Sequence, residues 1–220
     1  MKLTHSLLVL ALTATSGGAL AQEDISKVNG AINTTTATQY RDLETVNGSI
    51  TVADNVTARE ISTVNGTIQT GHQLNAHSVE TVNGSIRIGR NAVISKDVVA
   101  VNGSVFIDRG SRIGGDVETV NGSIGLVAAH VTGRIETVNG DITVGVDSQI
   151  NGGIDVRKPS LNISLSAPRK PKVIIGPHAV VNGRLNFERD VLLYVHTSAK
   201  VGEIIGATAV PFVTDTAPKD

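Results

Sequence analysis

Aliphatic residues recur along most of the chain every 18 or 19 residues, in a fixed relation to the tripeptide Val-Asn-Gly. The tripeptide begins at Val28, Val46, Val64, Val82, Val101, Val120 and Val138. An aliphatic residue lies three positions before each valine and another four positions after it, often with a third at plus six. The step from plus four to plus six has the period of a β-strand. The step of three before the valine breaks that period, so we expect a corner at the intervening Glu-Thr pair.

This repeat predicts an all-β fold, a single-stranded parallel β-helix or β-solenoid with triangular coils of 18–19 residues. Helix-pair repeats are longer, at about 33–47 residues, and β-branched, glycine-punctuated coils make weak helices. Stacked coils lie about 4.8 Å apart. One coil cannot be stable alone, because ordering its backbone costs more than its few buried aliphatic side chains contribute. The handedness is left open, since coils of this length occur in both hands.

Stacking gives each residue of the tripeptide an expected role. The valine joins the core, the asparagine forms a ladder of side-chain amides, and the glycine turns the corner in a conformation that other residues rarely adopt. These structural repeat positions are Asn29, Asn47, Asn65, Asn83, Asn102, Asn121, Asn139, Gly30, Gly48, Gly66, Gly84, Gly103, Gly122 and Gly140. The extra residue of the longer coils falls after plus six, as expected of a looped-out surface residue.

The N-terminus predicts export. Lys2 precedes an apolar stretch and the small-residue sequence Ala19-Leu20-Ala21, which is typical of a signal peptide cleaved before Gln22. A membrane-spanning helix is the alternative, but the apolar stretch is short and is interrupted by polar residues and glycine. We therefore expect a periplasmic or cell-surface bacterial protein with no transmembrane segment after cleavage.

The repeat pattern divides the rest of the chain. We assign residues 1–21 to the signal peptide, 22–156 to the Val-Asn-Gly coils, 157–172 to a proline-containing basic interruption, 173–208 to C-terminal coils and 209–220 to a flexible tail. A further Val-Asn-Gly begins at Val181. The interruption is interpreted as a surface loop or an inserted edge strand at residues 161–165. The alternative is a contact for an acidic polymer or lipid headgroup, made by Arg169, Lys170 and Lys172.

Composition narrows the chemistry. A formal net charge of −1 lacks the footprint of a nucleic-acid-binding protein, and the absence of cysteine excludes disulfides and thiolate sites. A sugar-cleaving enzyme needs paired carboxylates, for which Asp97, Asp116 and Glu118 are candidates; solvent-facing acids on a solenoid wall are the preferred interpretation. The two tyrosines, Tyr40 and Tyr194, make no sugar-stacking platform.

Hexapeptide acyltransferases use a histidine, and His178 lies in a segment similar to theirs. Export would separate this residue from cytoplasmic acyl donors, and the other histidines lack metal-ligand spacing. We therefore expect no enzyme, no catalytic residue, no cofactor and no metal site.

The recurring Glu-Thr-Val-Asn-Gly-Ser-Ile resembles the adhesin-like β-solenoid domains of exported bacterial proteins. Segments 96–103, 113–117 and 174–185 look similar to bactofilins, which are polymer-forming β-helix proteins. Both resemblances imply a β-solenoid fold and neither implies catalytic residues. Bactofilins are cytoplasmic and polymerise through their solenoid ends, and the predicted signal peptide departs from that pattern.

The leading hypothesis is a non-enzymatic, exported cell-envelope protein that acts as a structural scaffold or an adhesin-like binding surface. Its expected partners are envelope polysaccharide or protein, or further copies of itself joined end to end. The first alternative is a bactofilin-like self-assembling filament protein. The second is a polysaccharide-active β-helix enzyme.

Overall fold

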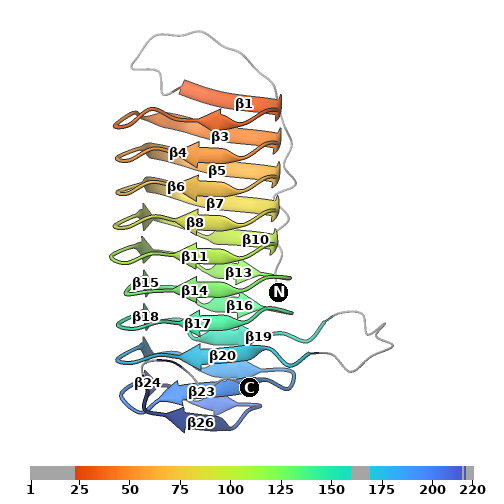
Figure 1. Cartoon of the computed structure of the whole chain (residues 1–220), viewed down its shortest axis with the longest axis vertical. Helices are drawn as coiled ribbons and strands as arrows, with labels where there is room; N and C mark the ends of the chain where they lie inside the picture. Colours follow the sequence, from red (N-terminus) through yellow and green to blue (C-terminus); the bar gives the residue numbers. More distant parts are fainter. Residues whose placement is uncertain (1–22, 160–168, 215, 217–220) are drawn as a thin grey trace.

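A computed structural model describes residues 23–159, 169–214 and 216 of the chain. These residues form 26 β-strands and no helix, and their strand pairs are parallel. The coils stack into a β-solenoid (Figure 1), which confirms the predicted fold class. The expected signal peptide and the expected strand at 161–165 lie outside the described residues.

One sheet takes a single strand from every coil, and its 10 strands therefore mark ten coils. Its strands are, in order along the stack, β2 (Ile32–Asn33), β4 (Ile50–Val52), β6 (Ile68–Thr70), β8 (Ile86–Ile88), β11 (Val105–Ile107), β14 (Ile124–Leu126), β17 (Ile142–Val144), β20 (Lys172–Ile175), β23 (Leu192–His196) and β26 (Ala209–Phe212).

The second sheet has 16 strands and divides into two rows after β7. Its long N-terminal strands are β1 (Glu23–Asn29), β3 (Tyr40–Asn47), β5 (Thr57–Asn65) and β7 (Asn75–Asn83). One row continues with β10 (Val98–Asn102), β13 (Val117–Thr119), β16 (Ile135–Thr137), β19 (Ile154–Val156), β22 (Leu185–Phe187) and β25 (Ile204–Ile205). The other row holds β9 (Val93–Ile94), β12 (Arg112–Ile113), β15 (His130–Val131), β18 (Gln149–Ile150), β21 (Val180–Val181) and β24 (Lys200–Val201).

A single inserted residue causes this division. Strand β7 pairs Ala76 with Ile94 of β9 and Val79 with Val98 of β10. Two residues separate the paired positions on β7, and three separate them in the next coil. The extra residue of the 19-residue coil therefore creates a corner that separates β9 from β10. The sequence predicts a looped-out surface residue at this place, and the structure has a new corner instead. The coils become three-sided from this point.

The core confirms the expected aliphatic positions but corrects the role of the valine. Side chains three before the tripeptide valine, and four and six after it, are buried from the second coil onward. Most of the valines are not core residues: Val28 is 53% exposed and Val82 is 40% exposed, whereas Val138, at 8%, is buried. Their place inside is taken by the preceding threonine, for example Thr45, which is 0% exposed.

The threonine also removes the corner that we expected at Glu-Thr. Strand β3 runs unbroken from Tyr40 to Asn47, with Leu43 and Thr45 both buried, as strand alternation requires. Threonine can be buried here because its hydroxyl donates to the backbone oxygen of a glycine in the preceding coil. The bonds are Thr45 to Gly30 at 3.1 Å, Thr63 to Gly48 at 2.9 Å, Thr81 to Gly66 at 3.1 Å and Thr119 to Gly103 at 3.0 Å.

The tripeptide glycines are needed for a reason other than the one expected. Only Gly30 has a positive φ, of 114°, among the seven. At the other six, a Cβ atom would collide with the backbone of the glycine one coil earlier; at Gly84 it would lie 2.5 Å from the carbonyl carbon of Gly66. Close packing of coil on coil therefore excludes any side chain at the corner.

The C-terminal part differs from expectation at two places. Residues 209–212 belong to strand β26, which pairs with β23, so the flexible tail assigned from residue 209 is wrong for these four. Phe212 is 6% exposed and packs edge-on against His196 with ring centres 5.1 Å apart. The late Val-Asn-Gly belongs to another column, because Val181 pairs with Ile150 in the β18–β21 row.

Candidate functional site

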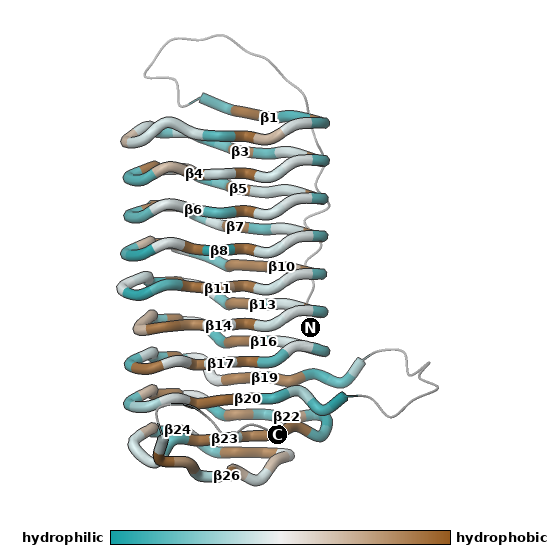
Figure 2. Tube along the Cα trace, viewed as in Figure 1, coloured by the Kyte–Doolittle hydropathy of each residue, from teal (hydrophilic) through white to brown (hydrophobic). Residues whose placement is uncertain are grey.

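The asparagines of the repeat form a continuous ladder along one corner of the solenoid. Each amide nitrogen donates to the amide oxygen of the preceding coil, in pairs 47–29, 65–47, 83–65, 102–83, 121–102 and 139–121, at 2.8–3.0 Å. The corner is hydrophilic in successive coils (Figure 2). Arg189 ends the ladder, since its guanidinium donates to Asn139 Oδ1 at 2.8 Å and to the Val138 carbonyl at 3.0 Å. These asparagines hold coils together.

The basic residues of the interruption contact acids of the same chain. Arg169 pairs with Asp141 at 2.7 Å, and the backbone nitrogen of Lys172 donates to the other oxygen of that carboxylate at 2.8 Å. Lys170 pairs with Asp190 at 3.1 Å. Asp141, which replaces the serine or threonine of most coils, therefore anchors the end of the interruption. These ion pairs offset the positive charge on which the binding hypothesis for this segment depends.

Acidic side chains gather on the outer face of β3, β5, β7, β10, β13, β16 and β19. One row of register partners there, the acid row, contains Glu44, Ser62, Glu80, Val99, Glu118, Glu136 and Asp155. Burial raises the pKa of Glu118 to about 7, and the carboxylates of Glu136 and Asp116 add to the rise. Burial and neighbouring carboxylates also raise the pKa values of Glu44 and Glu80.

The carboxylates that could have served a glycosidase are placed differently from one another. Asp97 accepts a hydrogen bond from the Asp116 backbone nitrogen at 2.8 Å, and Asp116 accepts one from the Arg134 nitrogen at 2.8 Å. Both therefore connect one coil to the next. Glu118 lies in the acid row beside a small hollow that Val99 and Glu136 also line.

A cationic surface lies at a different corner, where the ten-stranded sheet turns into the β9–β12 row. It consists of Arg87 on β8, Arg90 and Arg109 in the turns, and Arg112 on β12, and we refer to these four residues as the arginine corner. All four are exposed. Their side chains come from two adjacent coils, because the Asn91 nitrogen in one turn donates to the Arg109 carbonyl in the next at 3.0 Å.

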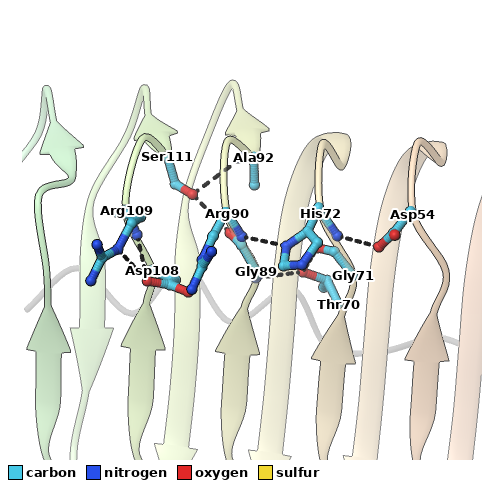
Figure 3. A network of polar contacts seen from close by, with 10 residues as sticks. All are labelled: Asp54, Thr70, Gly71, His72, Gly89, Arg90, Ala92, Asp108, Arg109 and Ser111. Carbon is cyan, nitrogen blue, oxygen red and sulfur yellow. Dashed lines mark hydrogen bonds and ion pairs between the residues drawn. The ribbon is translucent and has the colours of Figure 1, made fainter.

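One carboxylate lies between two of these arginines (Figure 3). Asp108 is 3.2 Å from Arg90 Nε and 3.7 Å from Arg109 Nε. Its pKa is lowered despite some burial, because the Arg109 backbone nitrogen and the two guanidinium groups stabilise the ionised carboxylate. Four guanidinium groups and one carboxylate leave this corner with a local charge of +3.

The turn that carries Arg90 is held by hydroxyl groups of the two adjacent coils (Figure 3). Ser111 Oγ donates to the Gly89 carbonyl at 2.9 Å and accepts from the Ala92 nitrogen at 3.1 Å. Thr70 Oγ1 accepts from the Gly89 nitrogen at 3.0 Å. The backbone positions of Arg90 and its neighbours are thereby set before any partner binds.

The remaining sequence candidate is His178. It occupies a left-handed turn position with φ 56° and is exposed, and its backbone nitrogen donates to Ser198 Oγ at 3.0 Å. Among residues 23–159, 169–214 and 216, no cluster of three or more histidine and acidic side chains could hold a metal ion. The same residues contain no helix with the length and apolar character needed to cross a membrane.

Comparison of the chain with known protein families, with curated proteins and with solved structures finds no match. The β-solenoid fold is therefore established by the structure of the chain itself.

The arginine corner was not found by sequence reasoning. Arg87 and Arg112 occupy other coil positions than Arg90 and Arg109, so no repeated sequence motif contains all four residues. The available signal was Arg90 and Arg109, which are 19 residues apart, the length of one longer coil.

Proposed function

We propose that the chain is an exported, non-enzymatic protein of a bacterial cell envelope, periplasmic or surface-associated. Its solenoid serves as a rigid scaffold or adhesin-like binding surface. The observation that carries the proposal is a stack of ten coils that places outward side chains in register. One outer face carries the acid row, in which Glu136 pairs with Arg157 and Asp155 with Arg134, and the arginine corner lies on another edge.

A rod of this kind suits binding to extended partners. Backbone pairing between coils fixes the positions from which the outward side chains project, so the backbone of the outer wall is ordered before binding, which lowers the entropic cost of association. The residues that are the same in every coil make the coil-to-coil contacts. The outward residues that differ between coils are therefore the ones available to bind a partner.

Export is tested by expressing the full chain with a C-terminal tag in a bacterium and fractionating the cells. We expect the protein in the periplasmic or envelope fraction, with an N-terminus at Gln22. A Val9→Arg variant, which interrupts the apolar stretch, should remain in the cytoplasm at full length. Recovery of the unaltered chain from the cytoplasm with Met1 intact would refute export.

A filament that assembles end to end is the second candidate, because the C-terminal coils expose apolar side chains. Ile205 is 39% exposed, Val210 49% and Val213 75%, and unpaired strand edges tend to associate. Filament formation predicts sedimentation that rises with protein concentration and is abolished by Val210→Lys. A single slow-sedimenting species at every concentration would exclude it.

A further inference from the structure

The arginine corner has more positive charge than its own chain compensates. Between residues 85 and 115 the sequence has two acids, Asp97 and Asp108. Asp97 contacts the backbone of the β10–β13 side, so Asp108 alone lies among the arginines. Arg90 and Arg109 share that one carboxylate, and their side chains are 55% and 62% exposed.

Two of the four arginines form no ion pair within the described residues. The guanidinium carbon of Arg87 lies 5.1 Å from the ring centre of Phe106, its register partner on the next coil. This contact orients Arg87 without neutralising it. Arg112 projects from β12 between its register partners Val93 and His130, neither of which is acidic.

The shape of this surface selects the kind of ligand. The four arginines wrap around a convex corner, so a single small anion would contact one or two guanidinium groups in open solvent. Exposed ion pairs of that kind are individually weak, at about 0–1 kcal/mol. A polymeric ligand with several anionic groups makes several of these contacts at once. Each guanidinium can bind a carboxylate, sulfate or phosphate through two parallel hydrogen bonds.

We propose that Arg87, Arg90, Arg109 and Arg112 form a binding site for a linear glycan with carboxylate or sulfate groups on successive sugars. The glycan crosses the corner and contacts both coils, while Asp108 limits the affinity by competing for Arg90 and Arg109. This site deepens the proposed function, because it names the ligand class of an envelope binding surface.

The test measures binding of the purified full-length chain to fluorescent oligosaccharides at low salt. A sulfated heparin oligosaccharide and an oligogalacturonate of equal length separate sulfate from carboxylate recognition. The variant Arg87→Gln/Arg90→Gln/Arg112→Gln should raise Kd about tenfold, the cumulative effect of three exposed ion pairs. The affinity should also fall between about 50 and about 300 mM salt, because these charges are screened.

A matched control removes the same amount of charge elsewhere. Lys27→Gln/Arg184→Gln/Lys200→Gln neutralises three exposed cations away from the corner and should change Kd less than about twofold. Asp108→Asn should tighten binding about threefold, because it frees two guanidinium groups and the amide oxygen can still accept from the Arg109 nitrogen.

Equal weakening by the corner variant and the control variant would overturn the proposal. So would the absence of binding to both oligosaccharides, or tighter binding to phosphatidylglycerol vesicles or to single-stranded DNA. These measurements use the purified protein and are independent of cell fractionation, so a failed export test would leave a positive binding result standing. Conversely, export without glycan binding would overturn this site alone.

Discussion

Replacing Gly84 by alanine adds one methyl group at the place where successive coils approach most closely. The added Cβ would lie 2.5 Å from the carbonyl carbon of Gly66, whereas real Cβ atoms essentially never come within 3.0 Å of a neighbour, and it would lie 3.2 Å from the Thr67 nitrogen, which is tight. Both atoms are backbone and cannot rotate away. The Gly66 carbonyl oxygen would lie closer still, so the two coils must separate by roughly one ångström at this corner.

Separation weakens the bonds that cross the corner. They include Gly66 N to Asn83 O at 3.0 Å, Ile68 N to Ser85 O at 3.0 Å and the ladder bond from Asn83 to Asn65 at 2.9 Å. At about 1 kcal/mol net for each bond, we expect the free energy of unfolding to fall by about 3 kcal/mol. For a chain of this length that loss lowers Tm by about 6–12 °C.

Gly125→Ala is the matched control. Gly125 is half-buried like Gly84 and lies in a strand, but a Cβ there would meet only Phe106 Cδ2, at an ordinary 3.5 Å. Both substitutions restrict the unfolded chain equally, so their difference isolates the close approach. Urea unfolding followed by circular dichroism should leave Gly125→Ala within about 1 kcal/mol of the unaltered protein. Coincident midpoints for the two variants would refute the close-packing explanation.

Three further predictions concern other positions of the repeat. Asn83→Ala removes two ladder bonds and should lower the free energy of unfolding in urea by about 1–2 kcal/mol, about twice the effect of Asn29→Ala at the end of the ladder, which removes one. Thr81→Val should cost about 1–2 kcal/mol in urea unfolding because it removes a buried hydrogen bond, whereas Val82→Thr on the outer face should cost less than about 0.5 kcal/mol. In the third, the pKa of Glu118 is raised from 4.5 to about 7, so the folded state binds its proton more tightly than the unfolded state, and stability falls as pH rises through this window. Glu118→Gln should therefore raise Tm at about pH 8 and leave it unchanged at about pH 4.

Each of these three has a result that would contradict it. Equal losses for the two asparagine variants would mean that the amides do not act as a ladder. A larger fall in the free energy of unfolding for Val82→Thr than for Thr81→Val would mean that the valine, not the threonine, is the core residue. A pH dependence of Tm that is the same with and without the Glu118 carboxyl would remove that group as its source.

The fold could be predicted because the repeat is nearly regular in length. In a parallel stack, equal spacing places the same position of each coil over itself, so seven identical asparagines have to lie in one column. The structure has the ladder bonds at 2.8–3.0 Å. Nothing beyond the spacing and the strand period was needed for that inference.

Which side chains of the long strand face the core could not be predicted as well, because the polar threonine, and not the adjacent valine, is buried. Hydrophobicity favours the valine as the core residue, and the three-residue step to it then requires a corner at Glu-Thr. The partner that makes threonine burial favourable, the glycine carbonyl 15 residues earlier for Thr81, belongs to another coil. A hydroxyl with a guaranteed acceptor is tolerated inside, and the valine is displaced to the surface.

The arginine corner and Asp141 could not be predicted because neither belongs to the repeat. Asp141 appears in the sequence as a single departure from serine or threonine. Its meaning depends on the return of the chain at Arg169 and Lys172, which no local pattern encodes. Likewise, the placement of Arg87 on β8 and Arg112 on β12 at the two sides of one corner follows only when the turn between β11 and β12 is known.

The cost of the charged surfaces indicates that the fold alone does not account for them. A raised carboxylate pKa means that the folded chain disfavours the ionised form, so Glu118 destabilises the solenoid at neutral pH while Val99 shows that an aliphatic residue fits the same row. At the arginine corner, two of the four cations share a single acid and the other two have none, although glutamine occupies a comparable outward position in Gln69, the register partner of Arg87. Charged residues at positions where neutral residues fit, and which the coil-to-coil contacts do not require, are best explained by what they bind. The experiments on the arginine corner therefore address the part of this solenoid that its coil-to-coil contacts leave unexplained.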